Sequence, residues 1–433
     1  LLALLAAVLV TACGGDAPSA DGPGGLDGAD FTLGWTGEEQ YALGGFEAVD
    51  WDAFGEVGGI GFDAAGQLYI LDAQAAKVRV VGTDGTLVRS FGERGEGPGE
   101  LNSPQSMAVF PDGAVAVYDF GKFGFVRYGP DGEWTEDVST DPSDIPFYGD
   151  FAVAGESNLY ANITGRIRMA MGPDSGGDDE EAESNPEDEG DPIVRLSLDQ
   201  GLDGETVFIG WEADPPEGPD SEFSGGSEGR NIEIVMPQLR AFEPSMEYAG
   251  LPDGGFAVVD STTYRVEVYA ADGTLRTEIE RPIAPVAVTP SIEAKEQQRQ
   301  RDELAEREAA GDDTGGLRIR MLGGGGGELS GMNEMMRERI ENMAFYPEIP
   351  VVEALGADLE GRIWIQRSSG DPGEEGPTDI VTSEGAYLGT LPADGLRIPD
   401  AFGPNGLAAW IETDEFDAAR IVVRRIVPEP GTS

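Results

Sequence analysis

Short apolar runs of strand length recur along the chain and alternate with tight polar turns. In the clearest stretch, apolar runs at residues 255–260 and 264–269 lie between the turns Pro-Asp-Gly at 252–254 and Ala-Asp-Gly at 271–273. Asp-Gly pairs accept the positive φ angle that a hairpin turn needs, and apolar runs of about five residues are typical of strands. The pattern predicts an antiparallel meander of four strands.

The same unit occurs six times, and the third copy is the most divergent. The copies span residues 59–91, 107–132, 150–211, 252–280, 351–391 and 404–426. One meander cannot bury both of its faces, whereas six meanders stacked around an axis bury a continuous core and leave only short edges. The sequence therefore predicts an all-β fold, a six-bladed β-propeller of four-stranded antiparallel blades over residues 36–427.

The sixth copy stops after its third strand, because a polar tail over residues 428–433 follows it. Its outer strand must come from another part of the chain, and the segment near residues 39–44, before the first copy, is available. We expect this N-terminal strand to close the last blade. The alternative is an incomplete sixth blade with an exposed edge.

The link after the first copy carries a family resemblance. Residues 91–101, Phe-Gly-Glu-Arg-Gly-Glu-Gly-Pro-Gly-Glu-Leu, are followed by Pro104, by Asp-Gly at 112–113 and by Asp119. This resembles the unit of NHL-like six-bladed β-propellers, especially their bacterial lipoprotein relatives, and the resemblance covers most of residues 36–427. It implies the propeller fold without implying one activity, because this fold hosts both binding proteins and enzymes.

The first residues look like a targeting segment. An apolar run over residues 1–10 ends in Val-Thr-Ala-Cys-Gly at 10–14, similar to the lipobox of a bacterial lipoprotein signal peptide. The run is too short to span a membrane. We expect residues 1–12 to be a signal peptide truncated at its start, Cys13 to be lipidated, and residues 13–35 to be a flexible tether. A small buried cysteine in a strand is the alternative. The expected location is the bacterial cell envelope, with the protein membrane-anchored and facing the periplasm or the cell surface.

Charge narrows the choice of partners. The formal net charge is −54, from 28 Lys and Arg against 82 Asp and Glu. Such a field repels phosphate backbones, so we expect no nucleic-acid partner. An acidic, hydrated surface suited to a saline habitat explains the charge, and a cation-binding surface is the alternative.

The long segments are predicted to share one face of the propeller. In a meander, the link between the second and third strands lies at the same end as the link to the next blade. The long segments all belong to these two classes: residues 165–191, 212–247, 281–350 and 367–378. Function usually lies on loops held by a rigid scaffold, so this face and the mouth of the central channel are the expected site.

The two main inserts differ in character. The acidic insert at about 165–191 has no apolar periodicity, so we expect a disordered loop; calcium capture is the alternative, although the EF-hand spacing is absent. The insert at about 281–350 begins with Thr289 and Pro290, a helix start signal, and predicts a helix to residue 311.

A second helix in this insert carries an apolar face. Its members share helical spacing and are Met332, Met336, Ile340 and Met343. Such a face either packs on its own domain or receives a partner, and it could form a lid.

The absence of histidine limits the chemistry. The chain has no His and one Cys, which excludes Ser-His-Asp triads, zinc sites with histidine ligands and disulfides within the chain. Carboxylate chemistry remains, as does a calcium site. Six-bladed lactonase-like enzymes hold calcium in the central channel, and Asn102, Asn158 and Asn162 could supply oxygen ligands.

Five residues near the elaborated face are candidates for ligand binding. They are Arg94, Asp119, Lys122, Asp260 and Arg265. The three cations could hold an anion, or they could pair with neighbouring carboxylates.

Two functions follow. The first is a non-enzymatic binding or scaffold lipoprotein for a peptide, glycan or protein partner. The second is a calcium-dependent, lactonase-like hydrolase with a carboxylate and asparagine site in the channel.

Overall fold

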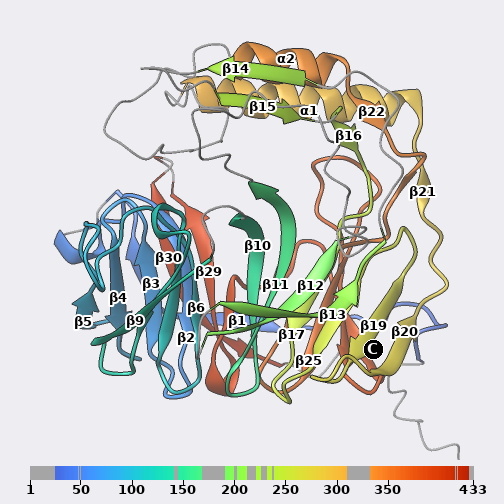
Figure 1. Ribbon diagram of the computed structural model, residues 1–433. Coiled ribbons are helices and arrows are strands. Elements are labelled where there is room, and N and C mark those ends of the chain that lie inside the picture. The colour runs from blue at the N-terminus through green and yellow to red at the C-terminus, as the bar shows by residue number, and fades with distance from the viewer. Residues whose placement is uncertain are drawn as a thin grey trace, which may run out of the picture.

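The chain forms a ring of six four-stranded sheets (Figure 1). The computed structural model describes residues 25–46, 48, 50–140, 145–167, 191–198, 202–211, 221–225, 232–236, 238–309, 332–414, 416 and 418–428. Each sheet is an antiparallel meander of consecutive strands, apart from the last, which takes one strand from the N-terminal segment. The predicted six-bladed β-propeller is confirmed.

The first three blades follow one another along the chain. The strands of blade one are β2 (Val57–Phe62), β3 (Leu68–Asp72), β4 (Lys77–Val81) and β5 (Leu87–Phe91). Those of blade two are β6 (Pro104–Val109), β7 (Val115–Asp119), β8 (Gly124–Tyr128) and β9 (Trp134–Ser139). Those of blade three are β10 (Ile145–Ala154), β11 (Asn158–Ile167), β12 (Pro192–Ser197) and β13 (Asp203–Ile209).

The last three blades carry the larger insert and the closure. The strands of blade four are β17 (Glu247–Gly250), β18 (Phe256–Val259), β19 (Arg265–Tyr269) and β20 (Leu275–Glu280). Those of blade five are β24 (Val352–Ala357), β25 (Arg362–Arg367), β26 (Thr378–Thr382) and β27 (Tyr387–Leu391). Those of blade six are β28 (Ala401–Phe402), β29 (Leu407–Thr413), β30 (Ala419–Val427) and β1 (Thr36–Gly44). Three 3-10 turns, η1 (Asp50–Asp52), η2 (Phe120–Lys122) and η4 (Pro404–Gly406), lie in links.

The N-terminal strand closes the ring as predicted. Strand β1 pairs antiparallel with β30, from Thr36 opposite Val427 to Gly44 opposite Arg420. The strand begins at Thr36, earlier than the predicted segment at 39–44. This pairing gives blade six its outer strand, so the first and last parts of the propeller hold one sheet together.

Turn chemistry explains the regular meanders. In blade four, Gly254 and Gly273 follow aspartates and have φ angles of +91° and +77°. Both values lie in the left-handed region that glycine enters at little cost. The Asp253 carboxylate accepts a hydrogen bond from the Gly255 N–H at 3.1 Å, which fixes the first of these turns.

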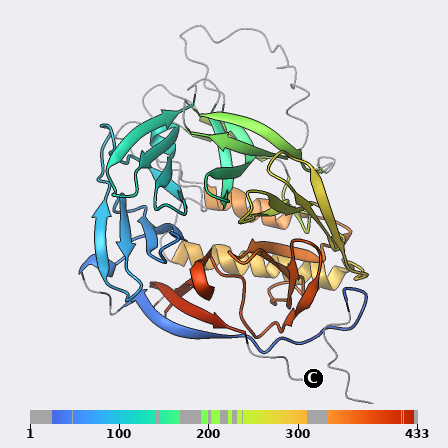
Figure 2. The same ribbon diagram turned by 90° about the horizontal axis from the view of Figure 1, so that it is seen from below.

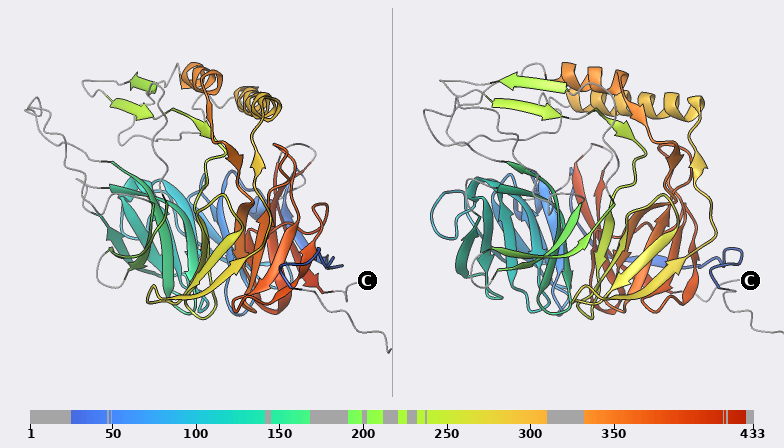
Figure 3. Two further views of the ribbon diagram at one scale, coloured as in Figure 1. Left: turned by 90° about the vertical axis from the view of Figure 1, so that its right-hand side faces the viewer. Right: turned by 45° about the vertical axis from the view of Figure 1, so that its right-hand side comes forward.

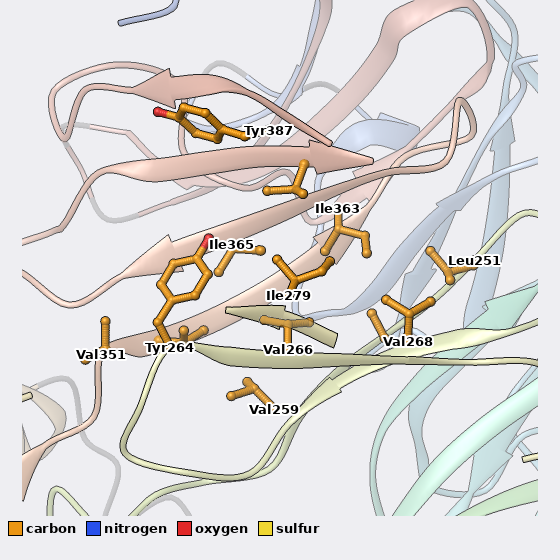
Figure 4. Close-up of a cluster of buried hydrophobic side chains, with 13 residues drawn as sticks. Leu251, Val259, Tyr264, Val266, Val268, Ile279, Val351, Ile363, Ile365 and Tyr387 are labelled. Atoms are coloured by element: carbon orange, nitrogen blue, oxygen red, sulfur yellow. The ribbon is translucent and has the colours of Figure 1, made fainter. Parts of the chain in front are cut away.

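The core lies between neighbouring blades. Between blades four and five, Val266 and Ile279 meet Ile363 and Ile365, and all four are almost fully buried (Figure 4). Comparable clusters join each of the remaining pairs of neighbouring blades around the ring. Each fully buried aliphatic side chain contributes about 1.5–3 kcal/mol of transfer free energy. The stacked blades therefore share one continuous core, as the repeat pattern predicts.

The segment before β1 packs along blade five. Thr32 forms a parallel bridge with Thr390 of β27, and the N–H of Leu33 donates to the Thr390 carbonyl at 2.8 Å. Leu33 is 7% exposed and belongs to the cluster between blades five and six. The predicted tether over residues 13–35 is thus fixed at its C-terminal end. Residues 1–12 and Cys13 lie outside the described residues.

A further layer covers one end of the ring (Figures 1 and 3). This inserted layer comes from the links after blades three and four. Its elements are the hairpin β14 (Ser221–Gly225) and β15 (Ile232–Met236), β16 (Arg240–Ala241), β21 (Val286–Ala287), α1 (Pro290–Ala309), α2 (Met332–Glu341), β22 (Ala344–Phe345) and β23 (Glu348–Ile349). Along the axis of the ring, α1 and α2 lie behind its centre (Figure 2). In the described residues, no helix is long and apolar enough to cross a membrane.

The two helices pack on each other. Helix α1 begins at Pro290 as predicted, with the Glu293 N–H donating to the Thr289 carbonyl at 2.9 Å. Ile340 and Met343 are 3% and 7% exposed and share a cluster with Leu304 of α1, and Met336 packs against it. The apolar face of the second helix therefore packs on its own domain, the first of the two alternatives. The side chain of Met332 and most of the acidic insert at 165–191 lie outside the described residues.

Candidate functional site

The elaborated links lie at one end of the propeller, which we call the elaborated face. The inserted layer covers this end (Figure 3). The blade-five loop over residues 368–377 reaches the layer, because Lys295 of α1 and Asp371 of the loop form an ion pair with a 2.7 Å Nζ–Oδ1 distance. For the described parts of the long segments, the rule that sorts links by strand order predicts the correct end, because a meander reverses direction at every turn.

Arg94 is engaged by backbone carbonyls. Its guanidinium donates to the Asn102 carbonyl at 3.2 Å and to the Gln74 carbonyl at 2.6 Å. Arg94 also forms a parallel bridge with Leu101, which closes the glycine-rich link into a compact loop. These contacts tie the link after blade one to the 73–76 turn of blade one.

Asp119 and Lys122 hold the other side of the same link. Asp119 is fully buried, and its carboxylate accepts hydrogen bonds from the N–H groups of Asn102 and Ser103 at 2.7 and 2.9 Å. Burial raises the pKa of Asp119, although these N–H groups and the charge of Lys122 act in the opposite direction. Lys122 donates to the Gly97 carbonyl and pairs with Asp137, both at 2.7 Å.

The remaining two candidates lie on blade four. Arg265 pairs with Glu267 and Glu278, with N–O distances of 2.5 and 2.6 Å. Asp260, at the end of β18, accepts a hydrogen bond from the Trp211 N–H at 3.0 Å. The five candidates therefore form two separate groups, one at the junction of blades one and two and one on blade four.

Asp260 belongs to an exposed aromatic surface that the sequence did not single out. Trp211 is 44% exposed and meets Tyr346 edge to face, with ring centroids 6.1 Å apart. The guanidinium of Arg240 lies 5.9 Å from the centroid of Tyr346 and forms a two-pronged ion pair with Glu243, at 2.8 and 2.5 Å. We call these five residues the Trp211 platform.

The platform joins three parts of the chain. Trp211 follows blade three, and Asp260 directly follows β18, the second strand of blade four. Arg240 and Tyr346 belong to the base of the inserted layer. An indole that is half open to solvent beside fixed charged groups suits a ligand with both apolar faces and hydroxyl groups. No spacing in the sequence could reveal it, since its members lie far apart along the chain.

The first strands of three blades carry a β-bulge near their start. Pairing skips one residue near the start of β2, β6 and β24, at Gly58, Gln105 and Glu353. Gln105 and Glu353 are exposed, whereas Pro104 and Val352 beside them are buried. A β-bulge redirects a side chain in this way and is common next to functional sites.

Glu353 has an unusual environment for an exposed carboxyl. The surrounding protein raises the pKa of Glu353 by desolvation, a nearby Glu375 raises it further, and a hydrogen bond from Ser368 lowers it. The residue is exposed, yet enough protein surrounds its carboxyl to desolvate it. Raised carboxyl pKa values are common among catalytic acids.

Two asparagines of the calcium hypothesis, Asn158 and Asn162, lie on β11 of blade three. Asn158 donates through its side chain to the Gly254 carbonyl at 2.9 Å, and the Asn162 N–H donates to the Tyr248 hydroxyl at 3.1 Å. Within the described ranges, no group of three or more His, Cys, Asp or Glu residues could hold a metal ion. The asparagines considered from the sequence therefore bring no carboxylate cluster with them there.

A shallow depression on blade one offers a weaker site. Phe54, Gln74, Asp72 and Arg79 are among the residues that line it. Its two charged groups satisfy each other, with 2.6 Å between Arg79 Nη1 and Asp72 Oδ2, and Arg79 also lies 5.3 Å from the centroid of Phe54. This pairing leaves the depression without a charged group directed at a ligand.

No protein-family profile and no curated protein matches this sequence. Among solved structures, the chain resembles a candidate exported protein from Bacteroides fragilis, at 10% identity over 93% of this chain and 97% of that one, with a TM-score of 0.46. It also resembles a member of the DUF4221 family from Bacteroides vulgatus, at 10% identity, 91% and 99% coverage and a TM-score of 0.45. A third is a gluconolactonase from Xanthomonas campestris, at 12% identity, 92% and 91% coverage and a TM-score of 0.36. Similarities at this level assign no activity to the chain.

Proposed function

We propose that this chain is a non-enzymatic binding lipoprotein of a bacterial cell envelope, with Cys13 as the lipidated residue and a glycan as the ligand of its elaborated face. The Trp211 platform is the observation that carries the proposal. The half-exposed Trp211 side chain meets the Tyr346 ring, and its backbone N–H binds the Asp260 carboxylate, so the platform offers the apolar and polar surfaces that a sugar also presents.

The charge of the protein narrows the glycan class. With a net charge of −54, the protein repels polyanions, so neutral or amino sugars fit better than uronic or phosphorylated ones. Peptide and protein partners are the other ligands that such a face accepts, and they are alternative outcomes of the same test.

The test is a titration with neutral, amino and acidic oligosaccharides, followed by tryptophan fluorescence and calorimetry. The key variant is Trp211→Ala. Its matched control is Trp134→Ala on β9, because both indoles are 44% exposed and only Trp211 is on the platform. The proposal requires saturable binding that Trp211→Ala weakens at least about tenfold, or about 1.4 kcal/mol, while Trp134→Ala has no effect. Equal effects of the two variants, or no binding by any sugar class, would reject it.

A second candidate function rests on Glu353. Its raised pKa and its exposed position at the bulge of β24 support a hydrolase or lactonase in which the Glu353 carboxyl donates a proton. A screen of lactones and esters, with and without calcium, tests this role. Turnover by the wild-type protein that Glu353→Gln abolishes would support it, and turnover that Glu353→Gln leaves unchanged would exclude it.

A further inference from the structure

The segment that precedes the closing strand is held at the outer edge of blade five. We call residues 28–33 the N-terminal strap. The Thr390 N–H of β27 donates to the Phe31 carbonyl at 2.8 Å, and the Phe31 N–H donates to the Tyr387 hydroxyl at 3.1 Å. These bonds position Asp30, the residue just before Phe31.

Asp30 places its carboxylate between two arginines from different blades. The distance from Arg281 Nη2 to Oδ1 is 2.5 Å, and that from Arg367 Nη2 to Oδ2 is 2.6 Å. The two arginine side chains are only 3% and 11% exposed. Burial alone would raise the pKa of Asp30, but the hydrogen bonds and charges of Arg367 and Arg281 hold it below its ordinary value.

The arginines need this carboxylate for charge balance. Besides Asp30, they face Asp379, which is fully buried; its Oδ2 lies 2.7 Å from Arg281 Nη1 and 3.5 Å from Arg367 Nε. The other oxygen of Asp379 accepts from the Thr390 hydroxyl at 2.6 Å. Without Asp30, two guanidinium groups would share one carboxylate. The shared pocket would then carry an excess positive charge.

Each arginine begins a segment that reaches the inserted layer. Arg281 follows β20 and is the first residue of the stalk, residues 281–285, which leads to β21. Arg367 ends β25 and is followed by the blade-five loop. The loop touches β21 at the end of the stalk, because a methyl group at Gly370 would lie 2.8 Å from a methyl group of Val286. The loop also pairs with α1 through Asp371 and Lys295, at 2.7 Å.

We propose that Arg281 and Arg367 form a carboxylate-binding site whose ligand is Asp30 of the same chain, and that its occupancy couples the N-terminal strap to the inserted layer. With Asp30 bound, the stalk and the blade-five loop are fixed together and the layer is held over the ring. When the strap is displaced, both segments loosen and the layer gains freedom. The inference is independent of the proposed ligand. It gives the N-terminal segment a mechanical role in addition to any tether role.

Hydrogen–deuterium exchange on the full chain tests this coupling with Asp30→Asn. Its control is Asp27→Asn, since Asp27 is an exposed carboxylate three residues earlier on the same segment. We expect Asp30→Asn to increase the exchange rate of amides in residues 281–289, 368–377 and the first turn of α1 at least about threefold. Blade two should be unchanged in both variants, and Asp27→Asn should behave as wild type.

Three results would overturn the proposal: faster exchange in all blades, which makes the strap a general stabiliser; a change confined to residues 25–35; and no change. The variant Lys295→Gln supplies an independent check downstream of the site. It should increase exchange in α1 and leave the 281–285 backbone unchanged. Combined with Asp30→Asn, it should give less than the summed effect on α1, because both variants interrupt the same connection.

Discussion

Two junctions between blades bury a carboxylate beside cations, and they satisfy it in different ways. At the junction of blades one and two, Asp119 accepts from the N–H groups of a link that lies within the same stretch of sequence. At the junction of blades four and five, Asp379 shares two arginines with Asp30, which comes from the far N-terminal end of the chain. The first junction is complete in itself, whereas the second depends on a remote segment.

The difference shows why short and long links behave differently. A short link can direct its own backbone at a buried carboxylate, so the cost of burial is offset locally. A long link leaves that position open, because its chain departs into the inserted layer. The remote strap then provides the missing charge. If the proposed coupling holds, the junction with the long link is the adjustable one of the two.

The largest effect is expected from neutralising Asp379. The substitution Asp379→Asn leaves the buried Arg281 and Arg367 with Asp30 alone and should lower the free energy of unfolding by about 3–5 kcal/mol. Urea denaturation followed by tryptophan fluorescence measures it. The control is Asp253→Asn, whose pair with Arg276 is 49% and 36% exposed and should contribute less than about 1 kcal/mol. Equal losses in the two variants would remove the distinction between a buried and a surface charge pair.

A smaller loss is expected at the self-contained junction. The substitution Asp119→Ala leaves the N–H groups of Asn102 and Ser103 without their acceptor, which should cost about 2–3 kcal/mol. The same urea experiment measures it, with Asp112→Ala in an exposed turn of blade two as the control. If Asp119→Ala costs more than Asp379→Asn, the ranking of the two junctions is wrong.

The sequence reveals the repeated part of the molecule well. Asp-Gly turns and strand-length runs identify the blades, and the missing outer strand of blade six locates β1, because these signals are local or follow from counting strands. The sequence also predicts at which end of the ring the inserted layer lies. The apolar face of Met336, Ile340 and Met343 left two alternatives open, and only packing against Leu304 decides between them.

Side-chain partners are less accessible to the sequence. The sequence singles out Arg94, Asp119 and Lys122 as polar residues near a link. It does not show that their side chains form hydrogen bonds with backbone groups around that link. Asp30 and Arg281 are 251 positions apart, and so no local pattern connects them. The bulge that exposes Glu353 is equally hidden, since it depends on the register of β24 against β25. Lipidation of Cys13 stays a prediction.

The pH dependence of Asp30 is a third test of the contrast. Because its folded pKa is lowered, Asp30 contributes stability above the unfolded value, near 4, and loses that contribution as pH falls through the folded pKa. Asp30 is 43% exposed, so the effect should be below about 1 kcal/mol. The stability difference between wild type and Asp30→Asn should shrink between pH 6 and pH 3 in urea titrations. Asp27→Asn should show no such trend, and a difference that grows on acidification would contradict the assigned sign.

The smallest effect concerns Glu353, which contacts Ser368 beside the junction of blades four and five. Ser368 follows Arg367, accepts a hydrogen bond from the Gly370 N–H at 3.0 Å and donates one to Glu353, favouring the ionised carboxylate. Glu375 repels that carboxylate and favours its protonated form. Ser368→Ala should therefore raise the pKa of Glu353, and Glu375→Gln should lower it. Carboxyl carbon chemical shifts recorded against pH would measure both pKa changes, with Gln105→Glu as a control that places a carboxyl at the equivalent bulge of blade two.

Changes in pKa of the same sign in the two variants would mean that neither neighbour controls the pKa of Glu353. Shifts of opposite sign would establish that the blade-five loop controls the pKa of Glu353, and any movement of this loop through Arg367 would then change the protonation of this carboxyl.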